Sequence, residues 1–70
     1  MKNKEIIFLI EESLDAGFEA KAVGYPIFTE GENEAEIRKN IREAVRCHFE
    51  ESDLPSFINI RFLREEQIAL

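Results

Sequence analysis

The chain is poor in the residues that hold very small domains together. It has a single cysteine, Cys47, so no disulfide can form within it, and no Cys/His set stands at metal-ligand spacing. A chain of 70 residues buries only about 60% of the surface that its unfolded form exposes, so an isolated copy is marginally stable. We therefore expect one domain over residues 1–70 that gains stability by forming a homo-oligomer, a dimer or larger.

Long apolar runs and a basic surplus are also absent. No stretch approaches the roughly 18 apolar residues of a membrane helix, and the apolar run near the N-terminus is too short for a signal sequence. The 15 acidic and 9 basic residues leave a formal net charge of -6. Because phosphate contacts need a basic patch, the composition argues against direct nucleic-acid binding. It fits a basic protein partner, or solubility alone, and we expect a cytoplasmic protein.

Asn33–Phe49 is the one segment with helical periodicity. Asn33 is a good N-cap, and Glu36 stands three residues on, at capping-box spacing. At about 100° per residue, one stripe of the helix is largely apolar. Its members are Ile37, Ile41, Ala44, Val45 and His48. The helix therefore has one face to bury and needs a sheet to bury it against.

Four other segments have the alternation or apolar character of strands. They are Glu5–Glu12, Phe18–Val23, Ile27–Glu30 and Phe57–Leu63. The segment Ser13–Gly17 predicts a turn. Arg64–Leu70 is a charged bend with a short apolar end, which extends the last strand, caps a neighbouring strand or frays. The pattern predicts an α+β fold, β-β-β-α-β. Its first three strands form an antiparallel meander, a fourth strand joins them, and one helix packs on one face.

The first strand is apolar on both faces, with Ile7 and Leu9 opposite the residues that face the helix. No second helix is available to cover Ile7 and Leu9, so a dimer or partner interface is the economical cover. We take five residues of this uncovered side and its neighbouring strands as the candidate interface. They are Ile7, Leu9, Glu19, Lys21 and Tyr25.

Two neighbouring helix residues carry reactive side chains. His48 could act as a general base or proton switch, but no motif supplies a nucleophile or an orienting group. We favour a half-buried structural imidazole near the helix C-terminus, and a small enzyme using His48 is the least favoured function. Cys47 is interpreted as a small buried apolar residue, because neighbours on a helix point about 100° apart and form no dyad.

Two charged groups have both a functional and a structural interpretation. Glu11, Glu12 and Asp15 could hold Mg²⁺, but a solvated turn is favoured, since no further acids stand on strands nearby. Arg38, Arg42 and Arg46 could grip phosphate or an acidic partner. A solvent face neutralised by the flanking residues Glu34, Glu43 and Glu50 is favoured for them, with Glu34 and Glu50 four residues from Arg38 and Arg46. There is no Gly-rich phosphate loop, no G-x-S-x-G and no zinc motif.

Several short segments follow one another between Gly17 and Ala44. They are GFEAKA, a proline-containing hairpin ending PIFTEG at Gly31, the acidic helix start ENEAE and the run NIREA from Asn40. In order and spacing this stretch resembles the HicB-like antitoxins. With the first strand included, the likeness covers roughly residues 5–49.

The resemblance implies a partial RNase H-like fold without RNase H catalysis, self-association, and binding to a small basic RNA-cleaving toxin of the HicA type. Members of that family usually add a C-terminal DNA-binding domain. This chain ends at Leu70, without room for one, so we do not expect operator repression. We predict a non-catalytic, protein-binding antitoxin module with no cofactor, metal or catalytic residue. The alternative is a stand-alone homodimeric interaction or scaffold domain without a toxin.

Overall fold

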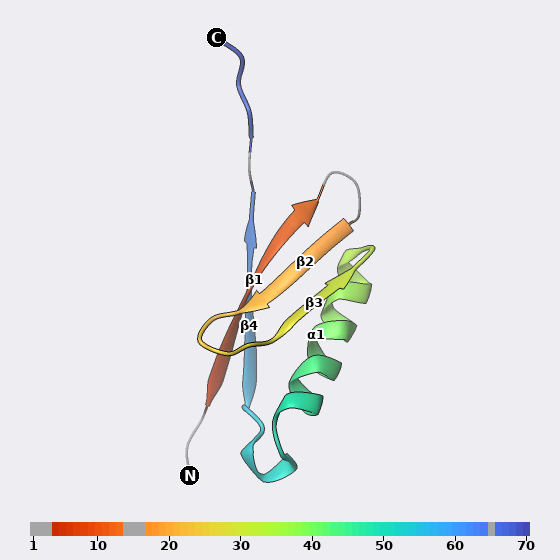
Figure 1. Cartoon of the computed structure of the whole chain (residues 1–70), viewed down its shortest axis with the longest axis vertical. Helices are drawn as coiled ribbons and strands as arrows, with labels where there is room; N and C mark the ends of the chain where they lie inside the picture. The colour runs from red at the N-terminus through yellow and green to blue at the C-terminus, as the bar shows by residue number, and fades with distance from the viewer. Residues whose placement is uncertain (1–3, 14–16, 65) are drawn as a thin grey trace.

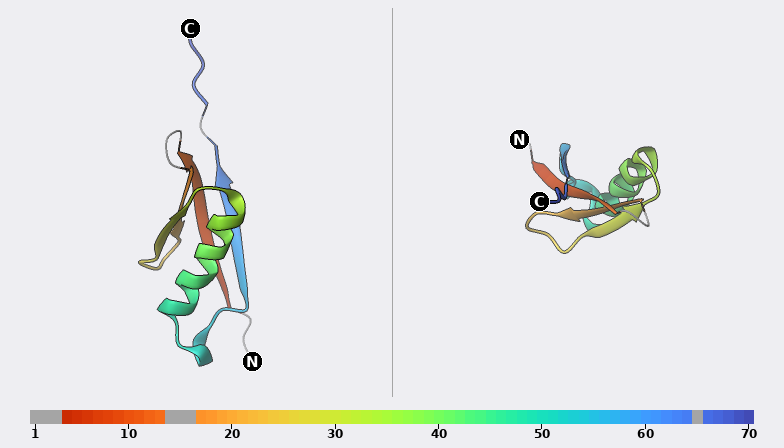
Figure 2. Two further views of the ribbon diagram at one scale, coloured as in Figure 1. Left: turned by 90° about the vertical axis from the view of Figure 1, so that its right-hand side faces the viewer. Right: turned by 90° about the horizontal axis from the view of Figure 1, so that it is seen from above.

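The computed structural model describes residues 4–13, 17–64 and 66–70, which form one sheet with a helix on one side (Figures 1 and 2). The elements are β1 (Glu5–Ser13), β2 (Gly17–Ala22), β3 (Phe28–Gly31), α1 (Glu34–His48), the short 3-10 helix η1 (Glu51–Asp53) and β4 (Phe57–Leu63). The α+β prediction with the order β-β-β-α-β is confirmed. Each predicted strand is present, with ends that coincide with the predicted ones or shift to the adjacent residue.

The sheet is mixed, and its strand order is β3-β2-β1-β4. β1 pairs antiparallel with β2, and β2 with β3, which confirms the meander. β4 returns after α1 and pairs parallel with β1, from Glu5 opposite Phe57 to Glu11 opposite Leu63. β1 is therefore an interior strand, which accounts for apolar side chains on both of its faces.

The start of α1 is held by two side-chain hydrogen bonds. Oδ1 of Asn33 accepts from the backbone N–H of Glu36 at 2.8 Å, which confirms Asn33 as the N-cap. Oε1 of Glu36 accepts in return from the backbone N–H of Glu32 at 2.6 Å. In a standard capping box this carboxylate would bond the N–H of the N-cap itself, Asn33, and here it bonds the residue before it. The two hydrogen bonds together fix the bend between β3 and α1.

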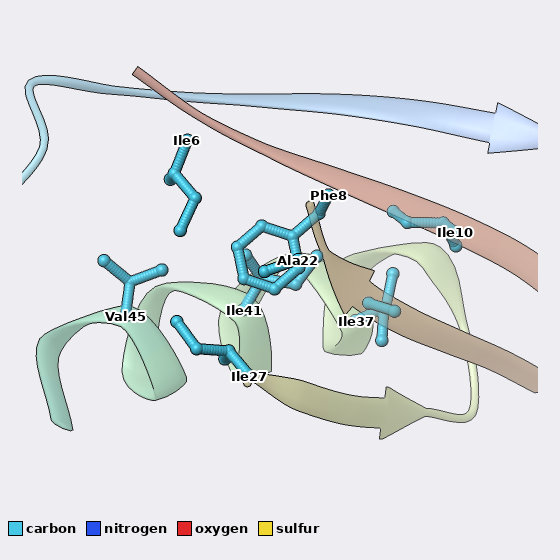
Figure 3. Close-up of a cluster of buried hydrophobic side chains, with 9 residues drawn as sticks. Ile6, Phe8, Ile10, Ala22, Ile27, Ile37, Ile41 and Val45 are labelled. Atoms are coloured by element: carbon cyan, nitrogen blue, oxygen red, sulfur yellow. The ribbon is translucent and has the colours of Figure 1, made fainter. Parts of the chain in front are cut away.

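The core lies between the sheet and α1, and Figure 3 shows most of its members. Its buried side chains are Ile6, Phe8, Ile10, Ala20, Ala22, Ile27, Ile37, Ile41 and Val45. α1 packs against β2 and β3, and the small side chains of Ala20 and Ala22 allow that approach. No polar side chain among the described residues is buried in this core.

One predicted turn and the C-terminal segment can be compared with the structure in part. The interior of the turn Ser13–Gly17, with Asp15, lies outside the described residues, but Gly17 has a φ of 85° as its turn role requires. At the other end of the chain, residues 66–70 have no regular secondary structure and lead away from the domain (Figure 1). They neither extend β4 nor cover a neighbouring strand.

Candidate functional site

The face of the sheet opposite α1 is uncovered in the described part of the chain. The strand registers place Leu9 between Lys21 on β2 and Arg61 on β4, with Phe28 opposite Lys21 on β3. The next row toward the N-terminus of β1 contains Ile7 beside Asn59. Leu9 and Ile7 are half-buried by their neighbours, whereas Phe28 is 59% exposed. An apolar strip flanked by cations therefore faces outward.

A row of three carboxylates borders that strip. Glu11 stands opposite Glu19, and Glu19 stands opposite Glu30, so one glutamate from each of three adjacent strands points to the uncovered face. Like charges directly opposite each other destabilise a sheet. A partner that brings positive charge to this row would relieve the repulsion between the three carboxylates, so the row favours binding to a basic surface.

The structure brings together four of the five predicted interface residues. Ile7, Leu9, Glu19 and Lys21 share the uncovered face. Tyr25 is exposed but lies elsewhere, since its ring makes edge-to-face contacts with His48 at 6.1 Å and Phe49 at 5.2 Å. Tyr25 follows Gly24, whose φ of 84° marks the turn that carries the chain round to the C-terminal end of α1. The single-face grouping is therefore right for four residues and wrong for Tyr25.

A second surface feature, which sequence reasoning missed, is a groove between α1 and β4. Because α1 packs on β2 and β3, the helix-facing side of β4 is left open. The groove has a volume of about 520 Å³. It is lined by Arg38, Ile41, Arg42, Val45, Arg46, Leu54, Pro55, Ser56, Phe57, Ile58 and Ile60. Its floor is apolar, and cationic side chains from the helix stand along one rim.

The arginine stripe borders this groove. Its three side chains are exposed and Arg38 is neutralised by Glu34, as predicted, whereas the predicted helical pairing of Arg46 with Glu50 is wrong. Arg38 does bond Glu34, at 3.3 Å, and its guanidinium carbon also lies 5.7 Å from the centre of the Phe62 ring on β4. Glu50, however, lies beyond the end of α1 at His48, so it is not at a helical spacing from Arg46. Arg42 and Arg46 therefore rim the groove with their charge available.

The interpretations of His48 and Cys47 as buried or half-buried residues are wrong. Both side chains are exposed, and the buried residues of α1 are Ile37, Ile41 and Val45. The cover ends within the last helical turn: Val45 is still buried, whereas His48 is exposed and its ring meets that of Tyr25 edge-on. His48 also packs edge-on against Phe49, with ring centres 4.9 Å apart. It is therefore one member of an aromatic group at the rim of the fold.

The acidic residues proposed for a metal site do not converge. Glu11 and Glu12 are consecutive residues of β1, so their side chains point to opposite faces of the sheet, and both are exposed. Asp15 lies outside the described residues. Across residues 4–13, 17–64 and 66–70, no group of three or more His, Cys, Asp or Glu side chains is placed to hold a metal ion.

Polar contacts between elements were not predicted from the sequence. Nδ2 of Asn40 donates to the backbone carbonyl of Glu30 at 2.7 Å and fastens the middle of α1 to β3. Lys4 Nζ lies 2.8 Å from Oδ1 of Asp53, and this hydrogen bond and the carboxylate charge raise the pKa of Lys4. For the contact between Asn40 and Glu30, the available signal in the sequence was the position of Asn40 at the start of the family-like run NIREA.

Neither helix in the described part of the chain has the length and apolarity needed to cross a membrane.

Comparison with known proteins gives one family. A UPF0150 protein of Thermotoga maritima is 40% identical over 67 residues, covering 96% of this chain and 94% of the relative. Another UPF0150 protein, from Archaeoglobus fulgidus, is 44% identical over 50 residues, or 71% of this chain and 74% of that relative. No family model and no solved structure matches. The similarity across nearly the whole of both chains places this protein in the UPF0150 family.

Proposed function

We propose that this chain is a non-catalytic protein-binding module of the HicB type, which acts in the cytoplasm by masking a small basic ribonuclease of the HicA type. The proposal includes the finer fold assignment, a partial RNase H-like domain. Its support is the order β-β-β-α-β and the family-like run from Gly17 to Ala44, whose Asn40 has a structural role in joining α1 to β3.

The observation that carries the proposal is the composition of the uncovered sheet face. It combines the half-buried apolar residues Ile7 and Leu9 with the row formed by Glu11, Glu19 and Glu30. Lys21 and Arg61 flank Leu9 within this face, and the glutamate row at its end is complementary to a partner that brings basic residues there. The net charge of -6 would also speed the encounter with such a partner at low ionic strength.

A binding and inhibition assay tests the proposal. A HicA-type ribonuclease encoded in the same genome is mixed with this protein, and both complex formation and RNA cleavage are measured. We expect a complex that suppresses cleavage. Glu19→Lys, on the uncovered face, should weaken it at least tenfold. Glu43→Lys makes the same charge change on the exposed side of α1 and should leave it unchanged. Equal effects of the two variants, or undiminished cleavage with wild-type protein, would contradict the proposal.

The second candidate function is a stand-alone homodimeric interaction domain without a toxin. The open outer edge of β4 favours it, because an unpaired strand is a ready surface for a second chain. A self-associating protein that binds no basic ribonuclease at micromolar concentrations would support this alternative over the first.

A further inference from the structure

The outer edge of β4 is free to accept another strand. β4 is the last strand in the sheet order, and its sequence FINIRFL contains no proline. The backbone N–H of Phe57 donates to the carbonyl of Lys4 at 3.2 Å, so Phe57 faces β1. Because bonding direction alternates along a strand, the N–H and C=O groups of Ile58, Ile60 and Phe62 point away from β1. An unpaired edge with apolar side chains is a template for pairing with a second chain.

The segment that follows β4 carries exposed apolar side chains. Ile68 is 84% exposed, and Leu70 is fully exposed. If the strand alternation of β4 is continued, both side chains fall on the same face as Ile58 and Ile60, which line the groove. Residues 64–67 read REEQ and contain no Gly, Pro, Asn or Asp. The segment therefore lacks the residues of a tight turn that would fold it back along its own β4.

The groove and this segment are complementary in chemistry. The groove has an apolar floor that includes Leu54, Ile58 and Ile60, and three arginines of α1 border it. The segment offers Ile68 and Leu70 for the floor and Glu66 for the arginine rim. Leu54 precedes the start of β4, whereas residues 66–70 continue outward from its C-terminal end (Figure 1), so the segment does not occupy the groove of its own chain.

We propose that two copies of this chain associate through antiparallel pairing of their β4 edges, and that each copy lays residues 66–70 in the groove of the other. A two-fold axis at Ile60 pairs the whole of β4 with itself. It sets Ile58 of one copy opposite Phe62 of the other, and Phe57 opposite Leu63. Apolar side chains then meet apolar side chains, and the outward N–H and C=O groups of the two edges face each other.

The strand register also explains how the segment reaches the groove. With Leu63 opposite Phe57 of the other copy, residues 66–70 run alongside the segment that contains that copy's Leu54, where its groove begins. Moving the axis to Arg61 would set two arginines directly opposite each other and shorten the paired length. This assembly leaves the uncovered sheet face available, so it does not depend on the proposed ribonuclease partner.

Sedimentation equilibrium on the full chain tests the assembly. Protein concentrations of roughly 1 to 100 µM cover the dissociation constants expected of a small interface. We expect a dimer in the wild type. Ile68→Asp should raise the dimer dissociation constant at least tenfold, because it places a charge on the apolar floor. Val23→Asp changes another exposed apolar residue, one next to Ile7 on the uncovered face, and should leave dimerisation unchanged. A monomer throughout, or a dimer weakened by Val23→Asp and not by Ile68→Asp, would overturn the proposal.

A charge-exchange pair tests the arginine rim. Arg46→Glu and Glu66→Arg should each weaken the dimer, and the double variant should recover part of the loss because the opposite charges are restored. Circular dichroism of each variant shows whether the monomer fold is retained. If the two losses simply add in the double variant, Glu66 does not face Arg46 and the docking of the segment along that rim is wrong.

Paramagnetic relaxation separates docking between chains from docking within one chain. A spin label is attached to Leu70→Cys in a Cys47→Ser background and mixed with isotope-labelled protein that carries no spin label. We expect selective broadening of the amide signals of Leu54, Ile58 and Arg46 in the isotope-labelled chains. Broadening only around Lys21 and Phe28, or none at dimer-forming concentrations, would overturn the proposal.

Discussion

Gly31, at the end of β3, touches the backbone of Ile37 in α1. A Cβ atom at position 31 would lie 2.7 Å from the backbone nitrogen of Ile37, closer than such atoms approach in proteins. Gly31 therefore sets how closely α1 lies on the sheet. We expect Gly31→Ala to lower the free energy of unfolding by about 2–3 kcal/mol, because two backbone segments must separate. Urea unfolding monitored by circular dichroism measures the loss.

Gly24→Ala is the matched control for Gly31→Ala. Gly24, unlike Gly31, has a left-handed backbone, with a φ of 84°, but a Cβ there would meet nothing within 4 Å. Its cost should be confined to the left-handed backbone, about 1 kcal/mol. If Gly24→Ala is as damaging as Gly31→Ala, close contact with Ile37 is not what position 31 requires.

Asn40 should stabilise the fold through its amide. Nδ2 donates to the Glu30 carbonyl, and Asn40→Asp replaces this donor with a carboxylate oxygen that faces another acceptor. We expect a loss of about 1–3 kcal/mol in the free energy of unfolding above pH 6, from the unsatisfied carbonyl. Asn40→Ala should be milder, because alanine favours the helix and brings no repulsion. Thermal unfolding of both variants gives the order, and the reverse order would contradict this role.

The helix cap provides an independent measure of local stability. Asn33→Ala removes the acceptor for the Glu36 N–H and should cost about 1 kcal/mol. Asn33→Ser keeps an acceptor oxygen at the same position and should cost a few tenths at most. Urea unfolding of the two variants side by side tests the cap, and indistinguishable midpoints for Asn33→Ala and wild type would contradict it.

The aromatic group at the end of α1 should contribute through Phe49 rather than through His48. Phe49 is half-buried and packs against the core, whereas His48 is exposed. We expect Phe49→Ala to cost about 2 kcal/mol and His48→Gln less than about 0.5 kcal/mol. Neither Cys47→Ser nor His48→Gln should alter partner binding. A His48→Gln variant that folds normally but loses an activity would revive the interpretation of His48 as a catalytic base.

The sequence was sufficient for the elements because local signals agreed with one another. The alternation of FINIRFL, the cap at Asn33 and the alanines of β2 each indicated one structure, and the core formed as their periodicities require. His48 was misplaced because helical periodicity says which residues share a stripe and not where the covering sheet ends. β3 has 4 residues and α1 has 15, so the end of the helix stripe at His48 extends beyond the strand that covers the rest of it.

The groove could not be predicted because it depends on the position of β4. The pattern of Phe57–Leu63 identifies a strand but does not state which neighbour it joins or in which direction. Once β4 pairs with β1, the far edge of the sheet is extended past the helix, and Arg42 and Arg46 border a groove instead of open solvent. On the other face, four of the five interface residues were grouped correctly because strand alternation alone decides which side they occupy.

The parallel pairing of β1 with β4 joins the first strand of the chain to the last. On the ribosome, β1, β2 and β3 emerge well before β4, so the nascent chain exposes one apolar edge of β1 until α1 and β4 have also been made. Non-local pairing of this kind slows folding, and the bare edge is open to pairing with other unfinished chains. A truncation within β4 would therefore be expected to aggregate, rather than persist as a smaller folded meander.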